Sequence, residues 1–223
     1  MESIIITIDG ASSTGKSSLA KAIAKHYGFK HIDSGAMYRA LTFYAQDHNL
    51  LNDHKFNVDM LIDKLPTIDI DFTNADEIRL NGKIIDGEVR SMEVSNKVSL
   101  VAKEPLFRQF MVAKQRKFGE KGNVVMDGRD IGSVVFPNAT IKFFLEASMK
   151  VRTNRRYAEL IEKGVQVSVE EVHSNIAKRD HIDSCREDSP LIIPENAILL
   201  SNDKEGLTEL LNIATTEIDK HLL

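Results

Sequence analysis

The residues from 10 to 17 read Gly-Ala-Ser-Ser-Thr-Gly-Lys-Ser, which is the Walker A spacing of a phosphate-binding loop. In such a loop, successive backbone N–H groups can point inward at anionic oxygens. Lys16 would bring a positive charge to the β- and γ-phosphates, and the Ser17 hydroxyl could ligate Mg²⁺. The sequence therefore predicts a nucleoside triphosphate site formed by Gly10, Ala11, Ser12, Ser13, Thr14, Gly15, Lys16, Ser17 and Ser18.

A second acidic position is typical of the same chemistry. Asp127 ends the apolar stretch Asn123-Val-Val-Met, which is the Walker B arrangement, and its carboxylate could orient water around Mg²⁺. Ser17 and Asp127 are thus the predicted metal residues. The seven histidines show no metal-ligand spacing, and we interpret them as surface or core residues.

The arginines indicate what the triphosphate is used for. Arg39, Arg129, Arg179 and Arg186 stand beside predicted strand ends or element junctions, and Arg152, Arg155 and Arg156 share one helix face. A solvated basic stripe is the alternative for the last three. Gly164 and the polar stretch after it form a plausible hinge, so we favour a lid. Arginines brought in by its closure could stabilise a transferring phosphoryl group, an effect of about 10³–10⁵ in rate.

Strands that alternate with helices must position these residues. We expect strands at 3–8, 29–32, 123–127, 140–145 and 198–200, and helices at 16–27, from 34 onward, at 148–163, at 168–180 and after an Asn202 cap. Ser168 and Glu171 form a capping-box pattern. This order predicts an α/β fold, with a parallel sheet flanked by helices on both faces.

The segment from 68 to 86 differs from the rest. Its apolar residues alternate with period two around Asn81-Gly82, a strong hairpin signal, so it predicts a small antiparallel insertion. A helical tract follows from about 92 to 118, which Pro105 should break or kink.

Composition excludes several classes of protein. A net charge of −4 argues against a bulk nucleic-acid binder, and no stretch is long enough to span a membrane. The single cysteine, Cys185, fits a reducing compartment. No guanine-reading Asn-Lys-x-Asp motif is present, which disfavours a regulatory GTPase, and 223 residues are few for a motor.

Several motifs occur in order along the chain. They are Ile-Asp-Gly…Gly-Lys-Ser-Ser at 8–18, Asp-Ser-Gly-Ala-Met-Tyr-Arg at 33–39, Gly-Glu-Val-Arg at 87–90, Asp-Gly-Arg-Asp-Ile-Gly at 127–132, and Arg-Asp…Asp…Arg at 179–186. Together they resemble the bacterial cytidylate kinases over about residues 4–190. The resemblance implies a P-loop kinase that transfers the γ-phosphate of ATP to CMP or dCMP with Mg²⁺. We expect a cytoplasmic monomer without nucleic-acid or membrane partners.

The resemblance also implies roles for individual residues. Lys16, Arg129, Arg186, Arg155 and Arg156 would be catalytic, and Arg39 would join Arg129 and Arg186 on the acceptor's phosphate. Ser99, Arg108 and Asp130 would read the cytosine, helped by Ser34, and Arg179 and Asp183 would approach the ribose. The chemistry agrees for Asp130, because a carboxylate accepts from the exocyclic amine of cytosine, where uracil offers an acceptor instead. Without the resemblance, Ser99 and Arg108 read as an ordinary helix surface.

The implied organisation is one kinase domain over 1–223. Its core comprises 1–38, 119–147 and 190–223, its monophosphate-binding region is 39–118 with the β insertion at about 66–90, and its short helical lid covers about 148–168. Two departures from the family pattern stand out. The loop has Ala11-Ser12-Ser13 where the family more usually has Pro and an extra Gly, and residues 181–185 contain no arginine. Two alternatives remain: a kinase of UMP or another small acceptor, and a non-catalytic ATP sensor.

Overall fold

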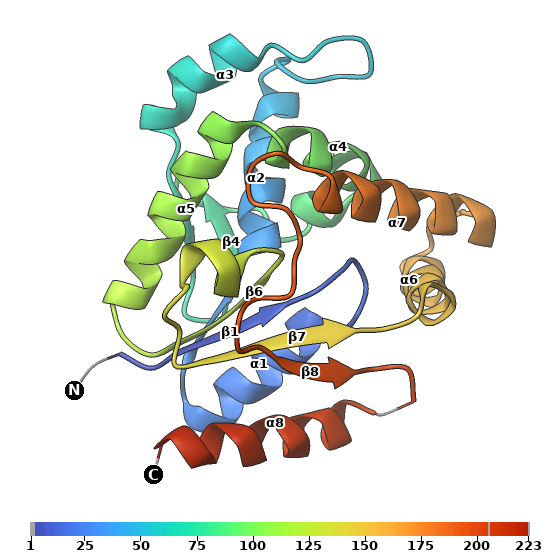
Figure 1. Cartoon of the computed structure of the whole chain (residues 1–223). Coiled ribbons are helices and arrows are strands. Elements are labelled where there is room, and N and C mark those ends of the chain that lie inside the picture. The colour runs from blue at the N-terminus through green and yellow to red at the C-terminus, as the bar shows by residue number, and fades with distance from the viewer. Residues whose placement is uncertain (1–2, 205, 223) are drawn as a thin grey trace. The chain divides into compact units, whose positions relative to one another are not determined.

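The computed structural model describes residues 3–204 and 206–222, so the ends of the predicted 1–223 domain lie outside the described residues. The chain forms two compact units, one joining residues 1–31 to 118–223 and the other comprising 32–117 (Figure 1). The finer partition into core, monophosphate-binding region and lid stays a prediction.

A five-stranded sheet forms the centre of the first unit. Its order is β2-β6-β1-β7-β8, with β1 at Ile5–Asp9, β2 at Lys30–Asp33, β6 at Val124–Gly128, β7 at Ile141–Glu146 and β8 at Ile198–Ser201. β1 pairs in parallel with both β6 and β7, and β7 pairs in parallel with β8. The central strand β1 is buried on both faces, as its unbroken apolar run predicts. The predicted parallel sheet is confirmed.

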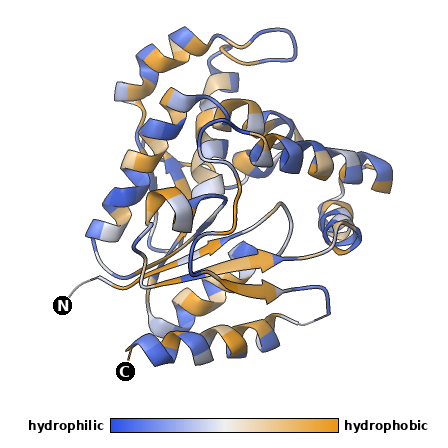
Figure 2. Cartoon of the chain, in the orientation of Figure 1, coloured by the Kyte–Doolittle hydropathy of each residue, from blue (hydrophilic) through white to orange (hydrophobic). Residues whose placement is uncertain are grey.

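Helices α1 (Lys16–Tyr27) and α8 (Leu207–Leu222) cover one face of this sheet. Their apolar stripes share a core with β1 and β7, in which Ile6, Leu19, Phe143 and Leu210 are buried. Figure 2 shows the difference in pattern, with mainly apolar residues along β7 and β8 and an alternation of apolar and polar residues along α8. Burial of these stripes is what fixes the helices on the sheet.

Further helices follow the sheet strands in this unit. α6 covers Met149–Glu162 and α7 covers Val169–Ser184, and the predicted capping box of Ser168 and Glu171 is confirmed. α7 continues four residues beyond its predicted end at 180. A short π-helix, Ile131–Val135, follows β6 and was not predicted, because its β-branched, apolar composition does not indicate a helix.

The prediction that Asn202 caps the last helix is wrong. α8 begins at Leu207, and the Asn202 side chain instead donates from Nδ2 to the Thr14 carbonyl oxygen at 2.7 Å. The side-chain oxygen that would cap a helix accepts instead from Arg155 Nη2 at 3.0 Å.

The second unit combines helices with a separate three-stranded sheet. Its helices are α2 (Ser34–Asp47), α3 (Val58–Lys64), α4 (Met92–Ala102) and most of α5 (Pro105–Glu120), with short 3₁₀ turns at Leu65–Thr67 and Glu88–Arg90. The sheet has β3 (Ile70–Phe72), β4 (Ile78–Leu80) and β5 (Lys83–Ile84), paired antiparallel. The insertion, its Asn81-Gly82 turn and the break at Pro105 are as predicted.

Within residues 3–204 and 206–222, no helix is long and apolar enough to cross a membrane.

Candidate active site

The loop between β1 and α1 depends on two glycines. Gly10 has φ 148°, and a Cβ there would overlap the Leu145 carbonyl oxygen. Gly15 has φ 100°, and a Cβ there would lie 2.6 Å from Asn202 Nδ2. Gly15 is also the N-cap of α1 and supplies no side-chain cap. The first N–H groups of α1 are therefore not capped by the preceding side chain, which suits an anion at the helix N-terminus.

Lys16 is buried within this loop. Its ammonium group donates to the Ala11 carbonyl oxygen at 2.6 Å and lies 3.4 Å from Thr14 Oγ1. The pKa of Lys16 is lowered to about 7, chiefly by burial and then by the positive charge of Arg129, which together outweigh the opposing effect of Asp127 and Asp9. A buried cation of this kind is stabilised by a polyanion.

Ser17 and Asp127, the predicted metal residues, are in contact. The Ser17 hydroxyl donates to Asp127 Oδ2 at 2.6 Å, and His31 Nε2 lies 2.8 Å from Asp127 Oδ1. Two adjacent oxygen ligands fit Mg²⁺, which keeps several waters and takes few protein ligands. His31 is buried, in agreement with the prediction of a surface or core residue. Its contact with Asp127 depends on the neighbouring strands β2 and β6, which no histidine spacing could indicate.

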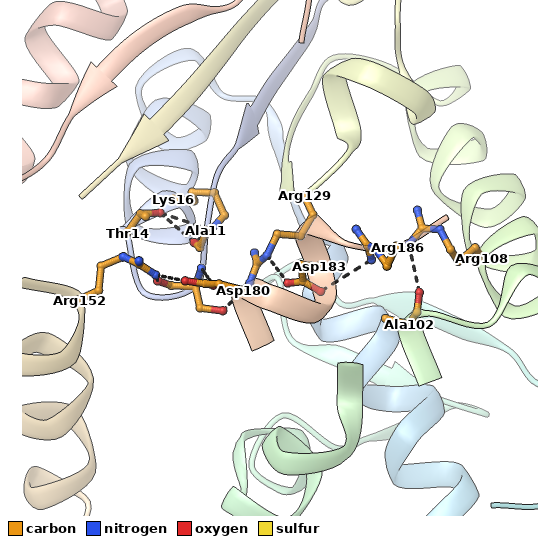
Figure 3. A network of polar contacts seen from close by, with 11 residues as sticks. Ala11, Thr14, Lys16, Ala102, Arg108, Arg129, Arg152, Asp180, Asp183 and Arg186 are labelled. Carbon is orange, nitrogen blue, oxygen red and sulfur yellow. Dashed lines mark hydrogen bonds and ion pairs between the residues drawn. The ribbon is translucent and has the colours of Figure 1, made fainter. Parts of the chain in front are cut away.

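Ser12 links the phosphate loop to three other segments. Arg129 Nη2 donates to Ser12 Oγ at 2.9 Å, and Arg152 Nη1 donates to the Ser12 carbonyl oxygen at 3.1 Å. The Ser12 N–H donates to Asp180 Oδ1 at 3.1 Å, and Asp180 also forms an ion pair with Arg152. Figure 3 shows Arg152 and Asp180 meeting beside the loop that carries Ala11 and Thr14. The sequence predicts Arg152 as one of three arginines on a lid helix, but its contact with Ser12 and its pairing with Asp180 join distant segments and were not predicted.

Three of the predicted acceptor residues lie together. Arg129 Nε donates to Asp183 Oδ2 at 2.9 Å, and Arg186 Nη1 lies 3.9 Å from Asp183 Oδ1 (Figure 3). Burial opposes the charge of Arg129, but Asp183 and Asp180 outweigh it, so the pKa of Arg129 is raised. Arg179, on the same helix as Asp183, is partly buried.

The two arginines predicted to act from the lid differ in their contacts. Arg155 Nη2 donates to the Asn202 carbonyl oxygen at 2.8 Å and to Asn202 Oδ1 at 3.0 Å, and Asn202 in turn holds Thr14. Arg156 Nη1 donates instead to Glu159 Oε2 at 2.8 Å, on its own helix. The structure thus connects Arg155 to the phosphate loop and pairs Arg156 with Glu159. Ser18, at the start of α1, is exposed.

A buried carboxylate, Asp9, ends β1 immediately before the phosphate loop. Asp9 Oδ1 accepts from the Ile131 N–H at 2.8 Å, and Oδ2 accepts from the Gly132 N–H at 2.7 Å. Burial raises the pKa of Asp9 to about 7, although these N–H groups and Lys16 lower it. Asp130, predicted to read the base, is the buried N-cap residue of the π-helix and makes no side-chain capping bond.

The remaining predicted residues belong to the second unit. Ser34 is the buried first residue of α2, and Arg39 Nη2 lies 2.8 Å from Asp33 Oδ2 on the same helix terminus. Ser99 is buried on α4. Arg108, on α5, is 1% exposed and donates from Nη1 to the Ala102 carbonyl oxygen at 3.3 Å, with its guanidinium 5.8 Å from the Tyr38 ring centroid. The helix-surface interpretation of Ser99 and Arg108 is therefore wrong.

Comparison with known proteins gives consistent matches. Residues 6–220 match the family model described as cytidylate kinase. The chain is 46% identical over 207 residues to a cytidylate kinase of Flavobacterium johnsoniae, which covers 91% of this chain and 90% of that protein. It is 46% identical over 214 residues to a cytidylate kinase of Parabacteroides distasonis, covering 94% and 93%.

A solved structure of an uncharacterized protein from Eubacterium ventriosum is similar in fold. Its TM-score is 0.55 at 15% sequence identity, and the match covers 98% of this chain and 99% of that one.

Proposed function

We propose that this chain, which belongs to the cytidylate kinase family, transfers the γ-phosphate of ATP to CMP or dCMP, giving ADP and CDP or dCDP. The family itself is one of phosphotransferases acting on small nucleotides. We further propose which residues of this chain bind the two substrates and assist the transfer.

One observation supports the proposal most strongly: arginines from two separate segments contact the phosphate loop around Lys16. Arg129 comes from the turn after β6, and Arg152 and Arg155 come from α6. A loop surrounded by cations in a chain of net charge −4 suits a polyphosphate ligand. Asp180 and Asp183 balance this charge within the protein.

On the donor side, we propose that the backbone of residues 10–15 and Lys16 hold the phosphates of ATP. Ser17 and Asp127 would hold Mg²⁺, which when bound would offset negative charge on the phosphate oxygens. Arg155, tied to Thr14 through Asn202, would add positive charge to the transferring group.

On the acceptor side, the proposed roles follow the chemistry of the side chains. Arg39, Arg129 and Arg186 would hold the monophosphate, and Arg179 and Asp183 would approach the ribose. Asp130 would accept a hydrogen bond from the cytosine amine, with Ser34, Ser99 and Arg108 completing base recognition. Uracil would be disfavoured because Asp130 would face another acceptor.

These groups would speed the reaction by positioning and by charge. The attacking phosphate oxygen of the acceptor is already an anion, so a strong general base is not needed. The preorganised arginines would stabilise charge that moves toward the leaving ADP.

A coupled assay of ADP formation across CMP, dCMP, UMP, AMP and GMP tests the proposal. CMP or dCMP should give the highest kcat/KM. Greater activity on AMP or GMP would contradict the proposal, and a preference for UMP would favour the first alternative. ATP binding without turnover on any acceptor would favour a sensor.

We also propose a cytoplasmic location and a monomeric state. The single cysteine is compatible with the cytoplasm, and a nucleotide site made by one chain is compatible with a monomer. Sedimentation equilibrium of the full chain checks the second point, and a dimer would contradict it.

A further inference from the structure

The π-helix Ile131–Val135 begins directly after the turn that carries Arg129 and Asp130. The first N–H groups of any helix have no partner inside it, and a buried N–H without a partner is costly. The residue that usually satisfies them is the N-cap, through a side-chain oxygen. Here the N-cap is Asp130, a residue type that caps well, but its carboxylate makes no capping bond.

Asp9 supplies the cap from a different strand. It is 0% exposed, and its two oxygens accept one hydrogen bond each, from the N–H groups of Ile131 and Gly132 at 2.8 and 2.7 Å. Asp9 is also the register partner of Gly128, the residue before Arg129. The end of β1 therefore fixes both sides of the turn, by strand pairing at 128 and by carboxylate bonds at 131 and 132.

The hydrogen bonds to Asp9 require a glycine at position 132. A Cβ at this position would lie 2.8 Å from Thr7 Oγ1, 3.1 Å from Pro194 Cγ and 3.2 Å from Asp9 Oδ2. The conformation here does not require glycine, since Gly132 is absent from the positions of positive φ. The need for glycine is one of space, because the backbone must approach the Asp9 carboxylate closely.

We infer that Asp9 is a positioning residue for base recognition: by capping the π-helix in place of Asp130, it directs the Asp130 carboxylate to the acceptor's base and holds Arg129 in register. This inference rests on the proposed function, in which Asp130 reads cytosine. It assigns to the residue before the phosphate loop a role in acceptor selection, in addition to any effect on the donor.

Asp9→Asn tests the inference, because an asparagine keeps the shape but places an amide donor against one of the two N–H groups. We expect KM for CMP to rise by about tenfold and the preference for CMP over UMP to fall by a similar factor, the usual effect of losing one partner of a buried hydrogen bond. KM for ATP should stay within about threefold. A merely structural role would raise both KM values together.

Gly132→Ala provides a second route to the same effect, because the added methyl group pushes the turn away from Asp9 without altering a charge. Ile8→Val is the matched control. Ile8 precedes Asp9 on the same strand, is equally buried, and packs in the core with α1 and α8, away from Gly132. Its kinetic constants should stay within about twofold of the wild type.

Asp130→Asn separates the inference from the proposed function. If Asp130→Asn lowers the preference for CMP but Asp9→Asn and Gly132→Ala leave it unchanged, the inference is wrong and the proposed function stands. If Asp130→Asn itself leaves the preference unchanged, the proposed base reading is wrong, and the inference fails with it.

Discussion

Two helices in this protein begin after neighbouring parallel strands, and they differ in how their first N–H groups are capped. α1 follows β1 and has Gly15 as its N-cap, with no side-chain capping bond. The π-helix follows β6 and has Asp130 as its N-cap, and its first N–H groups are bound by Asp9 from β1. The first N–H groups of α1 receive no side-chain cap, and those of the π-helix are bound by a carboxylate from within the protein.

Under the proposed function, the end of β1 acts on both substrates. We propose that the backbone donors at α1 are themselves the phosphate-binding groups, so a side-chain cap there would compete with phosphate. At the π-helix the proposed binding group is the Asp130 carboxylate, and Asp9 binds the N–H groups in its place. Both arrangements depend on glycines that let the backbone approach closely, at Gly15 and at Gly132.

The largest expected effect comes from removing the charge at the α1 terminus. Lys16→Ala should lower kcat by about 10²–10³, the usual loss for one preorganised donor to a transition state. The fold should persist, because the substitution removes a buried charge that burial already disfavours, as the lowered pKa of Lys16 indicates. A coupled assay and a thermal melt measure the two properties. Lys21→Ala, at an exposed position on the same helix, is the control, and undiminished transfer in Lys16→Ala would contradict the assigned role.

Gly15 and Gly28 flank α1, and alanine substitutions at the two positions separate the cost in backbone conformation from an effect on ATP binding. Gly15→Ala combines φ 100° with a contact on Asn202, and we expect KM for ATP to rise by about tenfold or more. Gly28→Ala carries the same kind of backbone cost, with φ 69°, but no atom lies within 4 Å of the added methyl group. It should lose about 1 kcal/mol of stability and bind ATP normally. If Gly28→Ala raised KM for ATP as much as Gly15→Ala does, the effect would come from the backbone cost alone, and the loop at Gly15 would have no particular role in binding ATP.

The smallest effect is a pH dependence of stability at the other terminus. The pKa of Asp9 is raised from an ordinary 3.8 to about 7, chiefly by burial and also by Asp130, against the opposing effect of the Gly132 and Ile131 N–H groups and of Lys16. Between these pH values the unfolded chain ionises Asp9 and the folded chain does not, so the contribution of Asp9 to stability falls as the pH rises and levels off above about 7.

Chemical denaturation of wild type and Asp9→Asn at about pH 5 and pH 8 measures this. The wild type should lose about 2–3 kcal/mol relative to the variant across that range, because only the wild type titrates at position 9. Parallel pH profiles would mean that Asp9 keeps an ordinary pKa in the folded chain.

Local sequence patterns predicted most of the fold. The phosphate loop, the Asn81-Gly82 hairpin, the Pro105 break and the Ser168 capping box each depend on residues close together in the chain, and all are found in the structure. Ser17 and Asp127 could be paired because two known motifs place them at adjacent strand ends.

Contacts between distant segments could not be predicted in this way. His31 with Asp127, Asp9 with the π-helix, and Asp180 with Ser12 join residues separated by 96 or more positions, and no spacing along the chain encodes them. Asn202 was misassigned for the same reason, since a plausible local cap hid its contact with Thr14, 188 residues away. The burial of Arg108 likewise follows from packing around α5 and not from its own neighbours in the sequence.

The most direct test of the account follows the phosphate itself. ATP labelled at the γ-phosphate is incubated with the full chain and Mg²⁺, with and without CMP, and the labelled products are separated. The account predicts label in CDP, dependent on CMP, with little in inorganic phosphate. Label released as inorganic phosphate at a rate that CMP does not change would contradict it.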